Sequence, residues 1–287
     1  MADSPVALTV GGIELTADPT PVIDWALVDV QGWYESPDVD VPTQRRAIFP
    51  GQFSQAGRAG GKMITVNGEI RSKDRTMLME AVEELSAVLA DGSTGPMAVY
   101  DEDAGYRWAP VQRTGAPSFK FDEPDVVGFQ LQFVAPDAYR YGQSSTGSVG
   151  FAASSGSGMV FDLFPGGVMD FGPLPDFGIV SIQNPGSADA SPVFTVTGPS
   201  PSSGFTITDV VSGRSIVFRG VVPAGSVLTI DSSTGAVVLD GVADRFGDAV
   251  VEAWPVVPAR SSRSFLFEPL SSATDAQLTA TVTAAYW

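Results

Sequence analysis

The chain has 287 residues, a net charge of −17, and neither histidine nor cysteine. This length allows two domains, each with its own core. The missing residue types exclude disulfides, thiolate nucleophiles, zinc fingers and histidine-based acid–base relays. The acidity argues against binding to the phosphate backbone of nucleic acid.

Targeting signals are also missing from the sequence. The first ten residues, MADSPVALTV, lack the basic start and apolar core of a signal peptide. Nowhere do eighteen apolar residues follow one another, so we expect no membrane insertion.

The first 142 residues predict an α+β domain with one helix. Ser72 is the expected N-cap, and Gly92 the stop, of a helix whose apolar residues recur at a spacing of 3.6 residues. Alternating or short apolar runs predict strands on both sides of this helix, at residues 7–10, 12–15, 25–30, 62–70, 97–101, 106–113 and 127–134.

Residues 35–61 interrupt this pattern with a long loop that has no period. Such a loop in a compact domain is unusual unless it is disordered or reaches a partner. Its apolar side chains have nothing local to bury them, and its arginines stand out in an acidic chain. We therefore expect it to contact a neighbouring subunit through Arg45, Arg46, Ile48, Phe49, Phe53 and Arg58.

Composition changes after Gly142. Residues 143–178 are first rich in Ser and Gly and then rich in Phe and Pro. This predicts a connector whose aromatic part is anchored in a groove between domains or against a neighbouring subunit. Residues 179–287 contain nine short apolar runs separated by turn signals. This spacing predicts a β-sandwich or jelly roll.

The order of these segments resembles that of siphophage distal tail proteins. In the first half the resemblance rests on KMITVNGEI before the helix and on FQLQFVAPDAYRYG at the domain end. In the second half it rests on NPGSADASPVFTVTG, SGRSIVFRG, VPAGSVLTIDSSTGAVVLDG and VPARSSRSFLF. The resemblance implies a ring-forming (belt) domain at 1–142, a connector at 143–178 and a galectin-like sandwich at 179–287.

The same resemblance implies a structural role in the tail tip of the virion. Such proteins form a homo-hexameric ring that joins the tail tube to the tip or baseplate complex. The expected partners are the tail tube protein, the tape measure protein and tip hub or receptor-binding proteins, with assembly in the host cytoplasm. DNA would pass through an acidic channel without specific binding.

Other chemistry fits the sequence less well. GRAGGK at residues 57–62 lacks the spacing of a phosphate loop. The acidic turns at 101–103 and 122–125 could hold calcium or a hydrolytic carboxylate pair, but they lack EF-hand spacing. We therefore expect no enzyme activity, cofactor or metal.

Carbohydrate binding is the alternative function. A sandwich with exposed aromatic side chains can stack on sugars, and the candidates are Trp254, Tyr286 and Trp287. The competing interpretation places Trp254 in a strand core and the two terminal aromatics over the sandwich edge.

Overall fold

The computed structural model describes residues 6–16, 23–151, 178–272 and 274–287. It divides into two compact units. Unit 1 comprises Met1–Gly142 and Tyr286–Trp287, and unit 2 comprises Gln143–Ala285. Each unit is described below by itself.

Unit 1 begins with a tight hairpin. Strands β1 (Val6–Val10) and β2 (Ile13–Leu15) pair so that Val10 faces Ile13. Gly11 and Gly12 form the turn with φ angles of 58° and 86°. This backbone conformation favours glycine, as a two-residue hairpin loop requires.

The strands of unit 1 form a closed circuit of pairs. The order is β2-β1-β9-β10, after which β10 pairs with β12, β12 with β8, and β8 with β3. Thr16 completes the circuit, because its amide donates to the Trp25 carbonyl and its carbonyl accepts from the Leu27 amide, at 2.9 and 3.0 Å. The remaining bounds are β3 (Asp24–Gln31), β8 (Lys62–Arg71), β9 (Thr94–Asp101), β10 (Gly105–Arg113), β11 (Ser118–Glu123), which pairs with β12, and β12 (Val126–Ala135).

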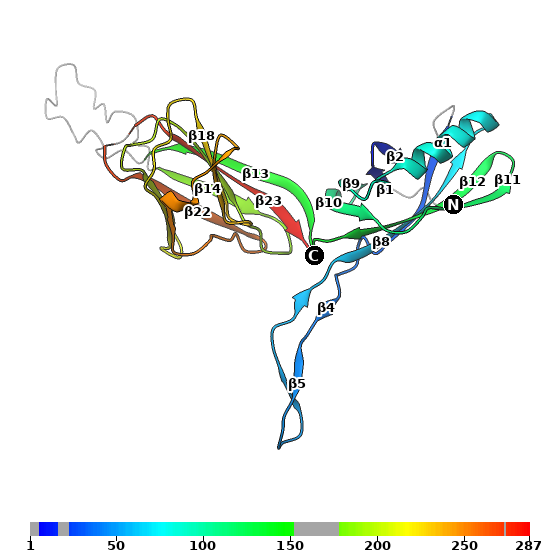
Figure 1. Ribbon diagram of the computed structural model, residues 1–287, viewed down its shortest axis with the longest axis horizontal. Coiled ribbons are helices and arrows are strands. Elements are labelled where there is room, and N and C mark those ends of the chain that lie inside the picture. The colour runs from blue at the N-terminus through cyan, green and yellow to red at the C-terminus, as the bar shows by residue number, and fades with distance from the viewer. Residues whose placement is uncertain (1–5, 17–22, 152–177, 273) are drawn as a thin grey trace, which may run out of the picture. The chain divides into compact units, whose positions relative to one another are not determined.

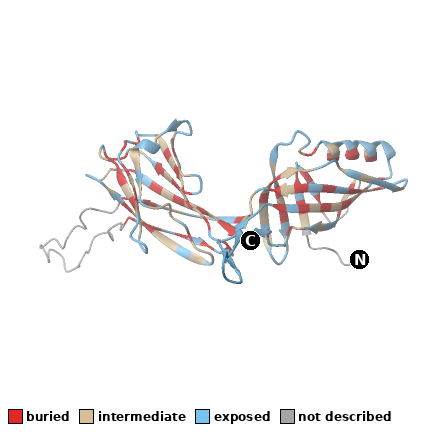
Figure 2. Cartoon of the chain, turned by 60° about the horizontal axis from the view of Figure 1, so that its bottom comes forward, coloured by how far each residue is buried: buried red, intermediate tan, exposed pale blue. Residues whose placement is uncertain are grey.

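Alternation places the core of unit 1 inside this circuit. Along β12 the side chains of Val127, Phe129, Leu131 and Phe133 are buried, while Gln130 and Gln132 between them are exposed. Figure 2 shows this alternation along the strands. The sequence pattern of the strand therefore predicted its buried face correctly.

The helix α1 (Arg75–Ala87) covers part of this core with Leu78, Ala81, Val82 and Leu85 (Figure 1). Its N-cap is Asp74, whose side chain accepts from the Thr76 amide at 2.8 Å. The prediction of Ser72 as the N-cap was wrong. Ser72 instead accepts from the Asp74 amide at 3.2 Å, because strand β8 extends one residue further than its apolar pattern indicates.

Unit 2 is a sandwich of two sheets within the described residues. One sheet has the order β13-β23-β15-β18-β19-β20 and the other β14-β22-β16-β17-β21. The rings of Phe194 on β15 and Phe265 on β22 meet edge to face, with centroids 4.9 Å apart, so the sheets pack through their apolar faces.

The bounds in unit 2 follow the predicted runs closely: β14 (Ile179–Asn184), β15 (Val193–Thr197), β16 (Phe205–Asp209), β17 (Ser215–Phe218), β18 (Val227–Asp231), β19 (Ala236–Leu239), β20 (Ala243–Asp244), the 3-10 helix η1 (Phe246–Asp248), β21 (Ala249–Val251), β22 (Ser261–Pro269) and β23 (Gln277–Tyr286). Both units together confirm the predicted class, a β-rich chain with an α+β domain followed by a sandwich.

The start of the predicted connector is instead a strand. Residues 143–150 belong to β13 (Arg140–Gly150), which pairs with β23. Hydroxyl pairs join the two strands: Ser144 with Thr283 at 2.9 Å, Thr146 with Thr281 at 3.2 Å and Ser148 with Thr279 at 2.8 Å. The prediction of a linker over residues 143–150 was therefore wrong, because it relied on their low hydrophobicity. The aromatic part of the connector lies outside the described residues, apart from Gly178.

Candidate functional site

The long loop predicted at residues 35–61 is an extended hairpin, here called the arm (residues 36–61). It contains two short ribbons, β4 (Val39–Asp40) with β7 (Arg58–Ala59) and β5 (Thr43–Arg45) with β6 (Gln52–Ser54). In Figure 1, β4 and β5 follow one another away from the end of β8. Every residue from 38 to 61 is exposed.

The apolar candidates lie at and near the arm's tip. Ile48 and Phe49 are in the tip and are 86% and 72% exposed, and Phe53 on β6 is 59% exposed. Phe53 faces Gln44 across the ribbon, and the guanidinium carbon of Arg46 lies 5.0 Å from its ring centroid. One face of the outer arm thus presents an aromatic ring next to a cation.

The arm has no core of its own. A two-stranded hairpin without a buried face is marginally stable in water at best. Exposed large apolar side chains gathered in one segment mark a surface that another molecule covers. The arm therefore leaves its apolar side chains uncovered within unit 1.

The root of the arm, by contrast, is anchored in unit 1. Trp33 is fully buried, and the Tyr34 hydroxyl donates to the Asp101 carboxylate at 2.7 Å. Gly32 has a φ of 81°, and a Cβ there would lie 2.1 Å from the Met63 carbonyl oxygen, so only glycine fits. Burial, followed by the bond to Asp101, raises the pKa of Tyr34 to about 12.

Lys62 is the buried cation at this root. Its ammonium group has no hydrogen-bond partner among the described residues. Burial, with a smaller contribution from the charge of Arg140, lowers the pKa of Lys62 to about 8.

The acidic turn considered as a metal or catalytic site has a local role at its first residue. The Asp101 carboxylate accepts from the amides of Asp103 and Ala104 at 2.9 and 3.0 Å, and also from Tyr34. These bonds, the one from the Ala104 amide first, lower the pKa of Asp101. Over the described ranges, no group of three or more acidic residues is arranged to hold a metal ion.

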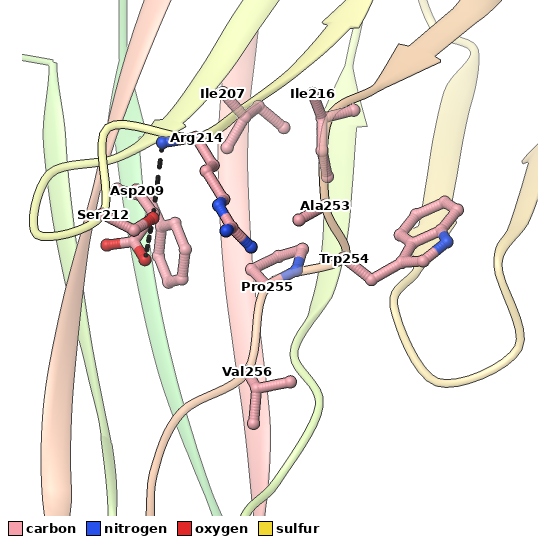
Figure 3. Close-up of a pocket in the computed structure, with 10 residues that line it drawn as sticks. Ile207, Asp209, Ser212, Arg214, Ile216, Ala253, Trp254, Pro255 and Val256 are labelled. Carbon is pink, nitrogen blue, oxygen red and sulfur yellow. Dashed lines mark hydrogen bonds between the residues drawn. The ribbon is translucent and has the colours of Figure 1, made fainter.

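Unit 2 contains a pocket of about 260 Å³ beside Trp254 (Figure 3). Its apolar lining includes Ile207, Ile216 and Phe265, and Arg214 lies at its polar side. The Trp254 indole points away from Arg214 (Figure 3) and packs near Gly235, where a Cβ would lie 3.3 Å from the ring. The sequence pattern had suggested that Trp254 lies within a strand. In the structure it lies after the end of β21.

Tyr286 and Trp287, the other two candidates for sugar stacking, fall in unit 1. The guanidinium carbon of Arg107 lies 3.4 Å from the Tyr286 ring centroid. The Trp287 ring lies 4.7 Å from that of Tyr139, and Arg140 donates to the Trp287 backbone oxygen. The two rings are thus already in contact with side chains of unit 1, and they belong to a different unit from Trp254.

The comparisons with known proteins connect this architecture to phage tails. Residues 185–255 match the family model of the siphovirus-type tail component, C-terminal domain. The fold of the SPP1 Dit protein, described as a paradigm of the hub adsorption apparatus in phages that infect Gram-positive bacteria, superposes with a TM-score of 0.69. That match covers 98% of this chain and 99% of the other, at 12% identity. The resemblance to siphophage distal tail proteins is thereby confirmed.

Other comparisons are weaker. A chain in the structure of the phage P2 baseplate in its activated conformation with calcium matches at a TM-score of 0.49 and 8% identity, covering 96% of this chain and 97% of the other. No curated protein has significant sequence similarity to the chain. No helix within the described ranges is long and apolar enough to cross a membrane.

Sequence reasoning missed the pocket residues and the root of the arm. The pocket combines the β16–β17 hairpin, the segment after β21 and one residue of β22. No local pattern links these three. The root depends on Tyr34 and Asp101, which are 67 positions apart. The available signals were the isolated Gly32 and the irregular apolar pattern of β3.

Proposed function

We propose that the chain is a structural component of a phage tail tip, in which residues 1–142 form a homo-hexameric ring. The ring joins the tail tube to the tip or baseplate complex and continues the DNA channel. The match of residues 185–255 to a siphovirus tail domain supports the tail assignment. The observation that carries the ring is the arm, because it exposes apolar residues that only another molecule can bury.

The energetics favour a subunit contact through the arm. Burying a side chain of this size contributes roughly 1.5–3 kcal/mol, so Ile48, Phe49 and Phe53 together would supply on the order of 5–9 kcal/mol before association costs. The arginines Arg45, Arg46 and Arg58 can pair with carboxylates of the next subunit and offset repulsion between acidic copies. Identical head-to-tail contacts close into a ring when their rotation permits.

In this proposal the remaining roles follow from the ring. The tail tube protein, the tape measure protein and tip hub or receptor-binding proteins are the partners, and the virion tail tip, assembled in the host cytoplasm, is the location. DNA passes through without specific binding, and no catalysis, cofactor or metal is required. Carbohydrate binding by the sandwich stays a prediction, since Trp254, Tyr286 and Trp287 form no common stacking surface within either unit.

The test is removal of the arm. Replacing residues 42–60 by a short Gly-Ser bridge should leave the melting temperature within a few degrees of the original, because every removed residue is exposed. It should also abolish ring formation in sedimentation experiments. Ile48→Ser with Phe49→Ser should weaken the ring in the same way.

The matched control is Val242→Ser, which removes an equally exposed apolar side chain from unit 2 (90% exposed). It should leave the assembly unchanged. Hexamers that still form after deletion of the arm would refute its role as the subunit contact.

A further inference from the structure

The outer half of the arm sets requirements for whatever surface receives it. Residues 43–54 contain two arginines and no acidic residue. The face with Phe53 and Arg46 presents a ring and a cation together, and the side chain of Arg45 has no partner among the described residues. A matching surface therefore needs exposed aromatic area next to free carboxylates.

Such a surface lies at the end of the β9–β10 hairpin of unit 1. Tyr100 and Tyr106 are directly opposite each other on the two strands. Their side chains therefore share one face of the sheet, and they are 52% and 58% exposed. No ring or cation stacking within the described chain covers either tyrosine.

Free carboxylates lie in the turn that joins these strands. Glu102 and Asp103 are exposed, and neither side chain has a partner among the described residues. Asp101, in contrast, is held by its own turn and by Tyr34. The hairpin end thus combines two uncovered rings with two uncommitted negative charges.

Other surfaces of unit 1 meet these requirements less well. At the β11–β12 turn the aromatic residue is Phe121, which already has the Arg75 guanidinium 5.3 Å from its ring centroid. The shallow groove over Gly68 and Gly128 is bordered by Lys120, which would repel the arginines of the arm.

We propose that Tyr100, Glu102, Asp103 and Tyr106, here called the receiving patch, bind the arm of a neighbouring copy of this chain. This inference rests on the proposed ring. The root of each arm is tied to the same hairpin through Tyr34 and Asp101, so each copy carries its patch beside the start of its own arm. From Asp38 to Phe49 an extended strand reaches roughly 36 Å, so the tip of the arm can contact a neighbouring copy rather than the patch beside its own root.

Engineered disulfides test this arrangement directly, because the chain has no cysteine of its own. Gln44→Cys lies on the Phe53 face of the arm, and Glu102→Cys lies in the patch. Combined in the full chain and oxidised, they should give a ladder of linked species up to the hexamer. Gln44→Cys with Glu123→Cys, at the acidic β11–β12 turn, is the matched control and should give none. A disulfide forms only when the Cα atoms approach to about 4.4–6.8 Å.

Charge reversal supplies a second, independent measurement. Glu102→Lys with Asp103→Lys should weaken assembly at least about tenfold, and adding Arg45→Glu with Arg46→Glu should restore it. Two results would contradict the receiving patch but not the proposed ring. In one, rings form normally while the cysteines at positions 44 and 102 give no disulfide; in the other, rings form normally while those at 44 and 123 give one. Failure of the unmodified chain to form any ring would contradict the proposed function and this inference with it.

Discussion

Lys62 is placed where a charge is costly, at the first residue of β8 and without a hydrogen-bond partner among the described residues. Its folded pKa of about 8 lies below the ordinary value of 10.5. Between these two values the unfolded chain binds a proton that the folded chain does not. The free energy of unfolding should therefore increase as pH rises through this window.

The corresponding prediction concerns Lys62→Met. The original chain should gain on the order of 1–2 kcal/mol between pH 7 and pH 9.5 relative to this variant. Burial raises the pKa of Tyr34 to about 12 and also raises that of Tyr141, so stability should fall again above pH 10, where tyrosines of the unfolded chain ionise. Urea unfolding at several pH values measures the difference. Parallel pH profiles of the two proteins would contradict the account of Lys62.

At the scale of elements, strand β13 shows how hydroxyl groups can replace apolar alternation. Its outward residues Ser144, Thr146 and Ser148 pair with threonines of β23, while Val149 is buried. Cross-strand pairs of this kind contribute roughly 0.2–1 kcal/mol each.

A charge test distinguishes this strand from a linker. Thr146→Asp with Thr281→Asp should destabilise unit 2 by more than the sum of the single changes, because like charges would then face each other across the ladder. Thr146→Asp with Thr281→Lys should recover most of the loss. Strictly additive effects in thermal melts, for both pairs, would mean that residues 143–150 do not pair with β23.

Sequence patterns predicted those elements whose burial alternates. The periods of β12, α1 and β23 follow directly from one buried face, and the runs at 193–197 and 277–286 match their strands residue for residue. The arm and β13 lack such a face. The strands of the arm pair only with one another and bury no side chain, and β13 pairs with the distant strand β23. An apolar pattern in the local sequence records neither arrangement.

The candidate site was predictable to the same extent. Ile48, Phe49 and Phe53 lack any period, and this correctly indicated that they have no core to join. The pairing of Tyr100 with Tyr106 could not be derived in the same way, because it depends on the register of β9 against β10. The assignment of Trp254 to one unit and of Tyr286 and Trp287 to the other depends on tertiary structure in the same manner.

At the scale of the whole molecule, the net negative charge opposes the association of copies of this chain. Each copy carries −17, and self-repulsion among like-charged copies disfavours a compact assembly. In the proposed ring, the arginines of the arm would act against this repulsion where neighbouring copies meet. An acidic channel would in turn let DNA pass without binding.

The mass of the assembled protein, measured by native mass spectrometry on the purified full chain, tests the central claim most directly. The account predicts a closed species of about 180 kDa, six times the 30.0 kDa chain, which is lost when the arm is deleted. A species that contains one or three copies, or a hexamer that persists without the arm, would contradict it.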